Sequence, residues 1–370
     1  MQPGGYKAFI PAPLPPDPPI RFSKELQKLL SQADRSLGRL DGSIETLPNA
    51  DLFVAMYVKK EAVLSSQIEG TQSSLQDVLE AEAQILSPER PRDVDEVFNY
   101  IKAMNVGLEL LNKLPVSSRL IRKIHQTLLS GVRGHQRNPG KFRKIQNWIG
   151  PSGCSIHEAV FVPPPPNHVP EAIKNLEEFL HKEESLPLLI KIGLAHCQFE
   201  TIHPFLDGNG RLGRLLITFL LCEQKALQRP VLYLSYYFKR HRQEYYERLQ
   251  AVRDKGAWEE WLIFFLQGVL ETSQQATETA RKILLLRERH QKMITENLGR
   301  IAANGHRVLD HLFAKPLISV NEVKQLNGIS YPAANNLVKK MVKLGILHEA
   351  TGRRRHRWFV YKAYIDLFYE

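Results

Sequence analysis

The chain has few cysteines, no long hydrophobic run and no targeting pattern at its N-terminus. Cys154, Cys197 and Cys222 are odd in number and lack CxxC or metal-like spacing, so we expect free thiols in a reducing compartment. No apolar run reaches the roughly 20 residues that span a bilayer, and the basic-then-apolar order of a signal peptide is missing. These absences predict a cytoplasmic protein without a membrane partner.

Basic residues are in excess. Lys and Arg number 50 against 39 Asp and Glu, which gives a formal net charge of +11. Residues 301–370 hold eleven Lys/Arg against five Asp/Glu, so this segment carries over half of the excess. The imbalance predicts an acidic partner. A chain of 370 residues is also too long for one compact helical domain and indicates two or three units.

The first twenty residues contain seven prolines, which favour an extended arm over a helix or a central strand. We expect this arm to lie over the body, with a PxxP-type signalling ligand as the alternative. Helical periodicity follows in several stretches and predicts a mainly α protein. These stretches are residues 23–42, with Gly42 as the stop, 52–69, 93–113, 117–129, 169–182, 186–200 and 258–289.

The stretch TIHPFLDGNGRLGR, from Thr201 to Arg214, concentrates residues suited to chemistry at a phosphate. A dense apolar run follows it and predicts a buried helix, so the Gly-Asn-Gly turn lies at a helix start. Unpaired backbone N–H groups at such a terminus bind anions, and the helix dipole adds to the attraction. Arg211 and Arg214, three residues apart, share one face, from which both reach phosphate oxygens.

Two other side chains in this stretch suit a reaction there. His203 has the pKa range of a general base. Asp207 lies beside the turn and is a candidate Mg²⁺ ligand, since Mg²⁺ takes one or two carboxylates plus phosphate oxygens. A DGNG turn or a histidine beside an apolar run is usually structural when it occurs alone. The two fragments together therefore indicate a functional site, whereas neither fragment would do so alone.

The pattern HPF-x-D-G-N-G-R-x-x-R resembles the signature of the Fic family at every specified position. The resemblance implies transfer of AMP from ATP to a Ser, Thr or Tyr hydroxyl of a target protein, with His203 as the base and Asp207 holding Mg²⁺. The phosphate-binding set that it implies is Asp207, Gly208, Asn209, Gly210, Arg211 and Arg214. Relatives that phosphorylate their target carry lysine where this chain has Gly210, so kinase-like transfer is not expected.

Residues 65–70, Ser-Ser-Gln-Ile-Glu-Gly, match the [S/T]-x-x-x-E-[G/N] inhibitory motif of the same family. Glu69 ends its helix, where the helix dipole disfavours a carboxylate and a nearby cation would compensate. The resemblance implies that Glu69 pairs with Arg214, so that ATP binds with a misaligned α-phosphate. It also adds Ser66 to the nucleotide-binding residues. A solvent-facing glutamate at a frayed helix end is the alternative.

Residues 147–162 alternate weakly around a Pro-Ser-Gly turn and predict a short β-hairpin. In the family a hairpin here, the flap, holds the target segment by adding a strand to its edge. The matching flap residues are Phe161 and Val162, whereas His157 is expected only to decorate the turn.

Aromatic residues after the signature are candidates for adenine stacking, although tyrosines at helical spacing are more often part of the core. By resemblance, Tyr245 and Tyr246 contact the nucleotide, with Tyr237 as the substitute. His196, on the helix before the signature, is expected to be a packed structural histidine.

Residues 301–370 read as three helices, a basic turn and an apolar strand, an order that resembles a winged helix. Pro332 is expected at the first position of the recognition-type helix. The basic turn, residues 353–357, suits contact with DNA phosphates, although winged helices also dock proteins.

The sequence therefore predicts a mainly α protein: a Fic helical core with a short β-hairpin flap, plus a C-terminal winged-helix domain. The expected division is residues 1–110 for the arm and inhibitory-helix region, 111–290 for the catalytic core and 291–370 for the winged helix. The expected function is an autoinhibited protein adenylyltransferase that uses ATP and Mg²⁺. The alternatives are AMP removal at the same site and a DNA-binding regulator with a Fic sensor body. The resemblance also allows a homodimer and self-modification.

Overall fold

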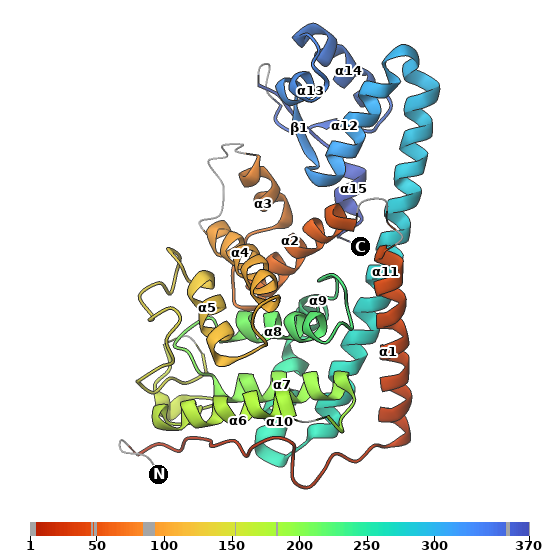
Figure 1. Cartoon of the computed structure of the whole chain (residues 1–370). Coiled ribbons are helices and arrows are strands. Elements are labelled where there is room, and N and C mark those ends of the chain that lie inside the picture. The colour runs from red at the N-terminus through yellow and green to blue at the C-terminus, as the bar shows by residue number, and fades with distance from the viewer. Residues whose placement is uncertain are drawn as a thin grey trace. The chain divides into compact units, whose positions relative to one another are not determined.

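The computed structural model is mainly α-helical, as the sequence predicts (Figure 1). It describes residues 5–45, 47, 50–83, 93–151, 153–182, 184–352 and 356–369. The chain forms two compact units. The first is made of residues 1–41, 61–72 and 95–274, and the second of residues 42–60, 73–94 and 275–370.

The helices before residue 300 follow the predicted stretches closely. They are α1 (Lys24–Glu45), α2 (Ala50–Ile68), α3 (Leu75–Glu82), α4 (Val94–Leu111), α5 (Ser118–Leu128), α6 (Val169–Lys182), α7 (Leu188–Ile202), α8 (Asn209–Glu223), α9 (Ser235–Arg240), α10 (Arg242–Lys255) and α11 (Trp258–Leu298). Two helix ends were predicted too early: α11 continues past residue 289 to Leu298, and α1 passes through Gly42 to Glu45. The apolar periodicity continues there, since Ile44 is buried one turn after Leu40, and burial outweighs the weak helix propensity of glycine.

The core of the first unit lies around α7. This helix is apolar on nearly all sides, the pattern of a buried helix, and α6 and α8 pack against it. At Gly193 it meets α11 closely: a Cβ there would lie 2.9 Å from Cδ2 of Leu262, and the indole N–H of Trp261 donates to the Gly193 carbonyl at 2.8 Å. The helix that leads into the signature is thus held on several sides.

The predicted hairpin is reduced to one isolated antiparallel bridge between Ile149 and Phe161. Between its ends the chain makes a single 3₁₀ turn at Ile156–Glu158, where His157 is exposed. The prolines at 163–166 lack an N–H donor, which stops the pairing from extending. We keep the name flap for residues 147–162.

The proline-rich arm is extended and lies along the first unit, as predicted (Figure 1). The N–H of Phe9 donates to the Val162 carbonyl at 2.9 Å, and the side chain of Gln198 donates to the Ala12 carbonyl at 2.7 Å. The arm therefore contacts both the flap and α7.

The second unit ends in a small helical and sheet assembly. Its elements are α12 (Ala302–Ala314), β1 (Leu317–Ser319), α13 (Val320–Asn327), α14 (Tyr331–Lys343), β2 (His348–Glu349), β3 (Trp358–Val360) and α15 (Lys362–Asp366). The strands form an antiparallel sheet of order β1-β3-β2, with Ile318 opposite Phe359 and His348 opposite Val360.

Two expectations for this region need comment. Pro332 is the second residue of α14, because Ser330 caps the helix by accepting the N–H of Ala333. Residues 353–355 of the basic turn lie outside the described part of the chain.

Two further expectations concern the state of the cysteines and the presence of membrane-spanning helices. All three cysteines are free thiols, as predicted. Within the described ranges, no helix is both apolar enough and long enough to cross a membrane.

Candidate functional site

His203 lies where α7 ends and the loop before α8 begins. Its backbone is left-handed (φ 49°, ψ 58°), a conformation uncommon for residues other than glycine. Its N–H donates to the Phe199 carbonyl at 3.0 Å, and its carbonyl accepts a hydrogen bond from Nε of Arg143 at 2.9 Å. These contacts on both sides of the residue hold the unusual backbone in place.

The imidazole of His203 is neutral near pH 7. Its pKa is lowered to about 4, first by burial and then by the guanidinium group of Arg253. Nδ1 lies 3.4 Å from the carbonyl of Glu200, which favours the proton on that nitrogen. In this tautomer Nε2 has a free lone pair, as a general base requires.

Asn209 holds the loop between His203 and α8. Its side-chain oxygen accepts the N–H of Phe205 and its amide donates to the Phe205 carbonyl, both at 2.9 Å. The side chain is almost fully buried. Asn209 therefore shapes the loop with its side chain and offers a ligand only its backbone N–H.

The start of α8 is the expected anion site. Gly208 is the N-cap with φ 77°, a left-handed value that glycine adopts at little cost. The N–H groups of Asn209, Gly210 and Arg211 open the helix, where no preceding turn supplies acceptors. An anion placed there gains both these donors and the helix dipole.

Asp207 lies beside this helix start with a partly exposed carboxylate. Its Oδ1 accepts the Gly208 N–H at 2.6 Å. Within the described residues, no group of three His, Cys, Asp or Glu forms a metal site. A single carboxylate next to an anion site suits Mg²⁺, which completes its shell with phosphate oxygens and water.

The guanidinium group of Arg214 is held by residues at the end of α2. Nη2 lies 2.7 Å from Oε1 of Glu69 and donates to the Ser65 carbonyl at 2.9 Å, while Nε donates to Oγ of Ser65 at 2.8 Å. Arg214 is 3 % exposed. The pairing that the sequence resemblance implied is present in the structure.

Electrostatics fix the charges of this pair. Burial alone would raise the pKa of Glu69, but the charge of Arg214 outweighs it and the pKa is lowered. Burial alone would lower the pKa of Arg214, and Glu69 raises it above its ordinary value. Both groups are therefore charged at neutral pH.

Ser66, expected among the nucleotide-binding residues, is fully buried, and its Oγ has no hydrogen-bond partner among the described residues. Its neighbour Ser65 makes the contacts with Arg214. Of the two serines in the motif, Ser65 therefore binds Arg214 and Ser66 is buried in the interior.

Arg211 meets carboxylates in this structure. Its Nη1 lies 3.0 Å from Oε2 of Glu96 on α4, and its Nη2 lies 3.7 Å from Oδ1 of Asp207. Glu96 also pairs with Nε of Arg133 at 3.2 Å. Arg211 is 1 % exposed, so Glu96 is the principal counter-charge of a buried guanidinium group.

Replacing Glu96 by glutamine is expected to lower the free energy of unfolding by about 2 kcal/mol, because a buried arginine loses its nearest full negative charge. Urea unfolding followed by circular dichroism measures the change. Glu244→Gln is the matched control, since its exposed pair with Arg248 at 2.9 Å predicts a change within about 0.5 kcal/mol. Equal changes in the two variants would contradict this role of Glu96.

Two buried carboxylates near Arg214 were not expected from the sequence. Glu61 accepts hydrogen bonds from the hydroxyls of Tyr100 and Ser235, and burial raises its pKa to about 7. Burial likewise raises the pKa of Glu200 to about 7. The Oε1 atom of Glu200 has no hydrogen-bond partner in the described part of the chain. The charge of Arg214 opposes the effect of burial on the pKa of both carboxyls, as it does for Glu69.

His125 on α5 positions the loop from the opposite side. Its Nδ1 accepts the N–H of Gly140 at 2.8 Å, so Nε2 carries the proton and donates to the Asp207 carbonyl at 2.9 Å. Its ring stacks on Phe205 with centroids 3.7 Å apart. Nothing in the sequence around His125 signals this role, because its partners lie far along the chain.

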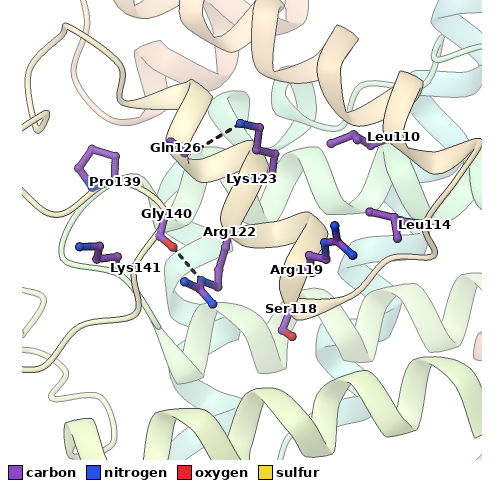
Figure 2. Close-up of a pocket in the computed structure, with 10 residues that line it drawn as sticks. All are labelled: Leu110, Leu114, Ser118, Arg119, Arg122, Lys123, Gln126, Pro139, Gly140 and Lys141. Carbon is purple, nitrogen blue, oxygen red and sulfur yellow. Dashed lines mark hydrogen bonds between the residues drawn. The ribbon is translucent and has the colours of Figure 1, made fainter.

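A cavity of about 560 Å³ lies beside α5 (Figure 2). It is lined by Arg119, Arg122, Lys123 and Lys141 together with Leu110 and Leu114. The Nε of Arg122 donates to the Gly140 carbonyl at 2.8 Å, drawn as a dashed line. None of the signature residues is among the described residues that line it. This basic hollow is therefore separate from the anion site at α8.

The three candidate tyrosines have different surroundings. Tyr245 is buried, and its hydroxyl lies 2.9 Å from Nε2 of His196, which is packed as predicted. Tyr237 is also buried, against Phe264. Tyr246 is 41 % exposed, and both Glu69 and Arg214 act on its hydroxyl electrostatically. Tyr246 is therefore the candidate best placed to meet a ligand.

Comparison with known proteins places these residues in a family. Residues 27–109 match the model described as Fic/DOC family N-terminal, and residues 115–221 match the model described as Fic/DOC family. A probable protein adenylyltransferase of Aquifex aeolicus is 33% identical over 181 residues, 47% of this chain and 51% of that protein. A protein adenylyltransferase Fic of Drosophila grimshawi is 30% identical over 170 residues, 44% of this chain and 32% of that protein. The chain thus spans about half of the first relative and about a third of the second.

Solved structures share the fold. A Fic family protein from Desulfovibrio desulfuricans G20 superposes with a TM-score of 0.63 at 19% identity, covering 93% of this chain and 97% of that one. A Fic domain-containing signalling protein from Bacteroides thetaiotaomicron gives a TM-score of 0.51 at 19% identity, covering 70% and 97%. The two family regions and the curated relatives make the chain a Fic/DOC family protein, homologous to probable protein adenylyltransferases.

Proposed function

We propose that this chain is an autoinhibited protein adenylyltransferase, which transfers AMP from ATP to a Ser, Thr or Tyr hydroxyl of a target protein. The observation that carries the proposal is the neutral imidazole of His203 beside a helix start whose Arg214 is held by Glu69. A base, an anion site and a guanidinium group on one loop and the helix that follows it are what nucleotidyl transfer needs.

The reaction follows from the placement of these groups. Nε2 of His203 accepts the proton of the target hydroxyl as its oxygen attacks the α-phosphorus of ATP. The new O–P bond forms while the bond to the β-phosphate breaks, and pyrophosphate leaves. The backbone N–H groups of Asn209, Gly210 and Arg211 stabilise the charge on the phosphoryl oxygens. Asp207 would hold Mg²⁺, which supplies positive charge to the phosphates when bound.

Inhibition is attributed to the position of Glu69. A Cβ on Gly210 would lie 2.2 Å from Oε1 of Glu69, so the carboxylate lies directly over the helix start. It occupies Arg214 and places a negative charge where the γ-phosphate would bind. With this contact intact, ATP would bind with its α-phosphate turned away from the attacking oxygen. Release of Glu69 would give Arg214 to the γ-phosphate.

The remaining parts of the function concern the partners. The flap residues Phe161 and Val162 are proposed to hold the target segment, and Tyr246 to contact the adenine, with Tyr245 and Tyr237 as the other candidates. The arrangement of α12 to α14 with the three-stranded sheet supports a winged-helix-like domain. Its contact with DNA or protein, and a homodimer, stay predictions.

The test is incubation of the full chain with ATP labelled either on the α- or on the γ-phosphate, in a lysate that supplies targets. We expect α-label on protein together with pyrophosphate release. Label from the γ-phosphate on protein would indicate phosphorylation, and the absence of any protein label from either ATP would contradict the proposal.

AMP removal at the same site is a second candidate, favoured by the electrostatic interaction of the Glu69 charge with His203. A carboxylate near the imidazole is suited to orient an attacking water. Incubation with a target that already carries AMP separates the two directions: release of AMP that needs Glu69 would favour removal.

The pH dependence of transfer should reflect the lowered pKa of His203. The base works unprotonated, so its loss on acidification is expected near pH 4, and between pH 6 and 8 the ring stays competent. The measurement is kcat/KM for transfer as a function of pH, from about pH 4 to about pH 8. An acid limb centred near 6.5 that persists in a variant carrying both Glu61→Gln and Glu200→Gln, which removes the two carboxyls whose pKa is raised to about 7, would contradict the neutral histidine.

A further inference from the structure

The edge of the flap already carries a segment of this chain. Phe9 of the N-terminal arm donates its N–H to the Val162 carbonyl at 2.9 Å, and its ring lies 6.1 Å from the ring of Phe161. Phe161 in turn lies 3.8 Å beneath the guanidinium group of Arg253. The arm is fixed a second time where Gln198 binds the Ala12 carbonyl. An extended segment therefore lies where the proposed function needs a target segment.

This segment carries one hydroxyl. Tyr6 is the only Ser, Thr or Tyr among the first 22 residues of the sequence. Gly5 lies beside the flap, since a Cβ there would be 4.0 Å from Cε1 of His157. Tyr6 thus falls between two flap contacts, at Gly5 and at Phe9, and its side chain is half-buried.

The position of Tyr6 relates it to the catalytic loop. Its phenol acts electrostatically on the guanidinium group of Arg143. Arg143 donates from Nε to the carbonyl of His203 at 2.9 Å and from Nη2 to the carbonyl of Pro164. The guanidinium group of Arg143 therefore binds both the proline segment that follows the flap and the backbone of His203, and it interacts electrostatically with Tyr6.

We propose that Tyr6 is a self-modification site, presented to His203 in the same molecule by the arm docked on the flap. The inference rests on the proposed function. The phenolic oxygen of Tyr6 attacks the α-phosphorus of ATP, Nε2 of His203 takes the phenolic proton, and the bond to the β-phosphate breaks to release pyrophosphate. The product is an AMP phosphodiester on Tyr6. Tethering raises the local concentration of this hydroxyl far above that of a free target.

The experiment uses the full-length Glu69→Gly variant with ATP and Mg²⁺, followed by intact and peptide mass spectrometry. We expect one AMP per chain on the peptide that contains Tyr6, formed at a rate per molecule independent of protein concentration. Adding Tyr6→Phe should reduce the self-labelling at least tenfold. Tyr331→Phe is the matched control, because Tyr331 is 49 % exposed on α14, and it should leave the labelling unchanged.

A second variant tests the docking without touching the acceptor. Phe9→Ala removes the ring contact with Phe161 and should slow labelling of Tyr6 several-fold, with AMP transfer to lysate proteins measured in parallel. Labelling only at other residues, or a rate that rises with protein concentration, would overturn the inference while transfer to lysate proteins upholds the proposed function. No AMP on any protein would overturn both.

Discussion

Replacing Glu69 by glycine is expected to raise the initial rate of AMP transfer by about 100-fold. The change removes the carboxylate that lies 2.7 Å from Nη2 of Arg214, so the guanidinium group becomes available to the γ-phosphate. A hundredfold gain corresponds to about 2.7 kcal/mol, which is in the range of a partly buried ion pair that must otherwise be broken for productive binding. Transfer of α-labelled ATP to protein, followed over time, gives the rate.

The cause of this gain can be separated from a general loosening of the chain. Glu69 follows the last residue of α2, so glycine at this position does not interrupt the helix. Glu69→Gln keeps the shape and loses the charge, and an intermediate gain is expected from it. Glu322→Gln is the matched control, since Glu322 makes an equally short pair of 2.7 Å with Lys315 in the second unit. Equal transfer rates for the wild type and Glu69→Gly would remove inhibition from the proposal.

The parts of the site that the sequence predicted are those that are local in the chain. The helix start at Asn209, the left-handed glycine before it and the loop from His203 follow from a few adjacent residue types. The contact between Glu69 and Arg214 joins residues 145 positions apart, and only the resemblance to a family pattern indicated it. Its inhibitory effect stays a prediction until the rates are measured.

Other parts had no local signal. Glu96 is an ordinary glutamate in the first turn of α4, and its pairing with Arg211 depends on how two helices pack. His125 looks like one more polar residue of an amphipathic helix, yet it joins Gly140 to Asp207. Such partners are determined by tertiary packing, and the periodicity and helix propensity of the sequence carry no information about it. The flap was overestimated for a different reason, since alternation predicts strands whereas the surrounding prolines limit the described pairing to one bridge.

The neutral base gives the second large effect. In the Glu69→Gly background, His203→Asn is expected to lower the transfer rate by about 1,000-fold while ATP binding changes less than about twofold, because loss of a positioned general base costs between about 100- and 10,000-fold. Asparagine is chosen because it tolerates the left-handed backbone of this position (φ 49°), whereas alanine would add strain of its own. Single-turnover transfer and nucleotide titration measure the two quantities. His348→Asn, an exposed histidine of β2 in the second unit, should alter neither. If His203→Asn retained transfer within tenfold, the proton would leave the target by another route. The lowered pKa of the ring would then be only a consequence of its burial.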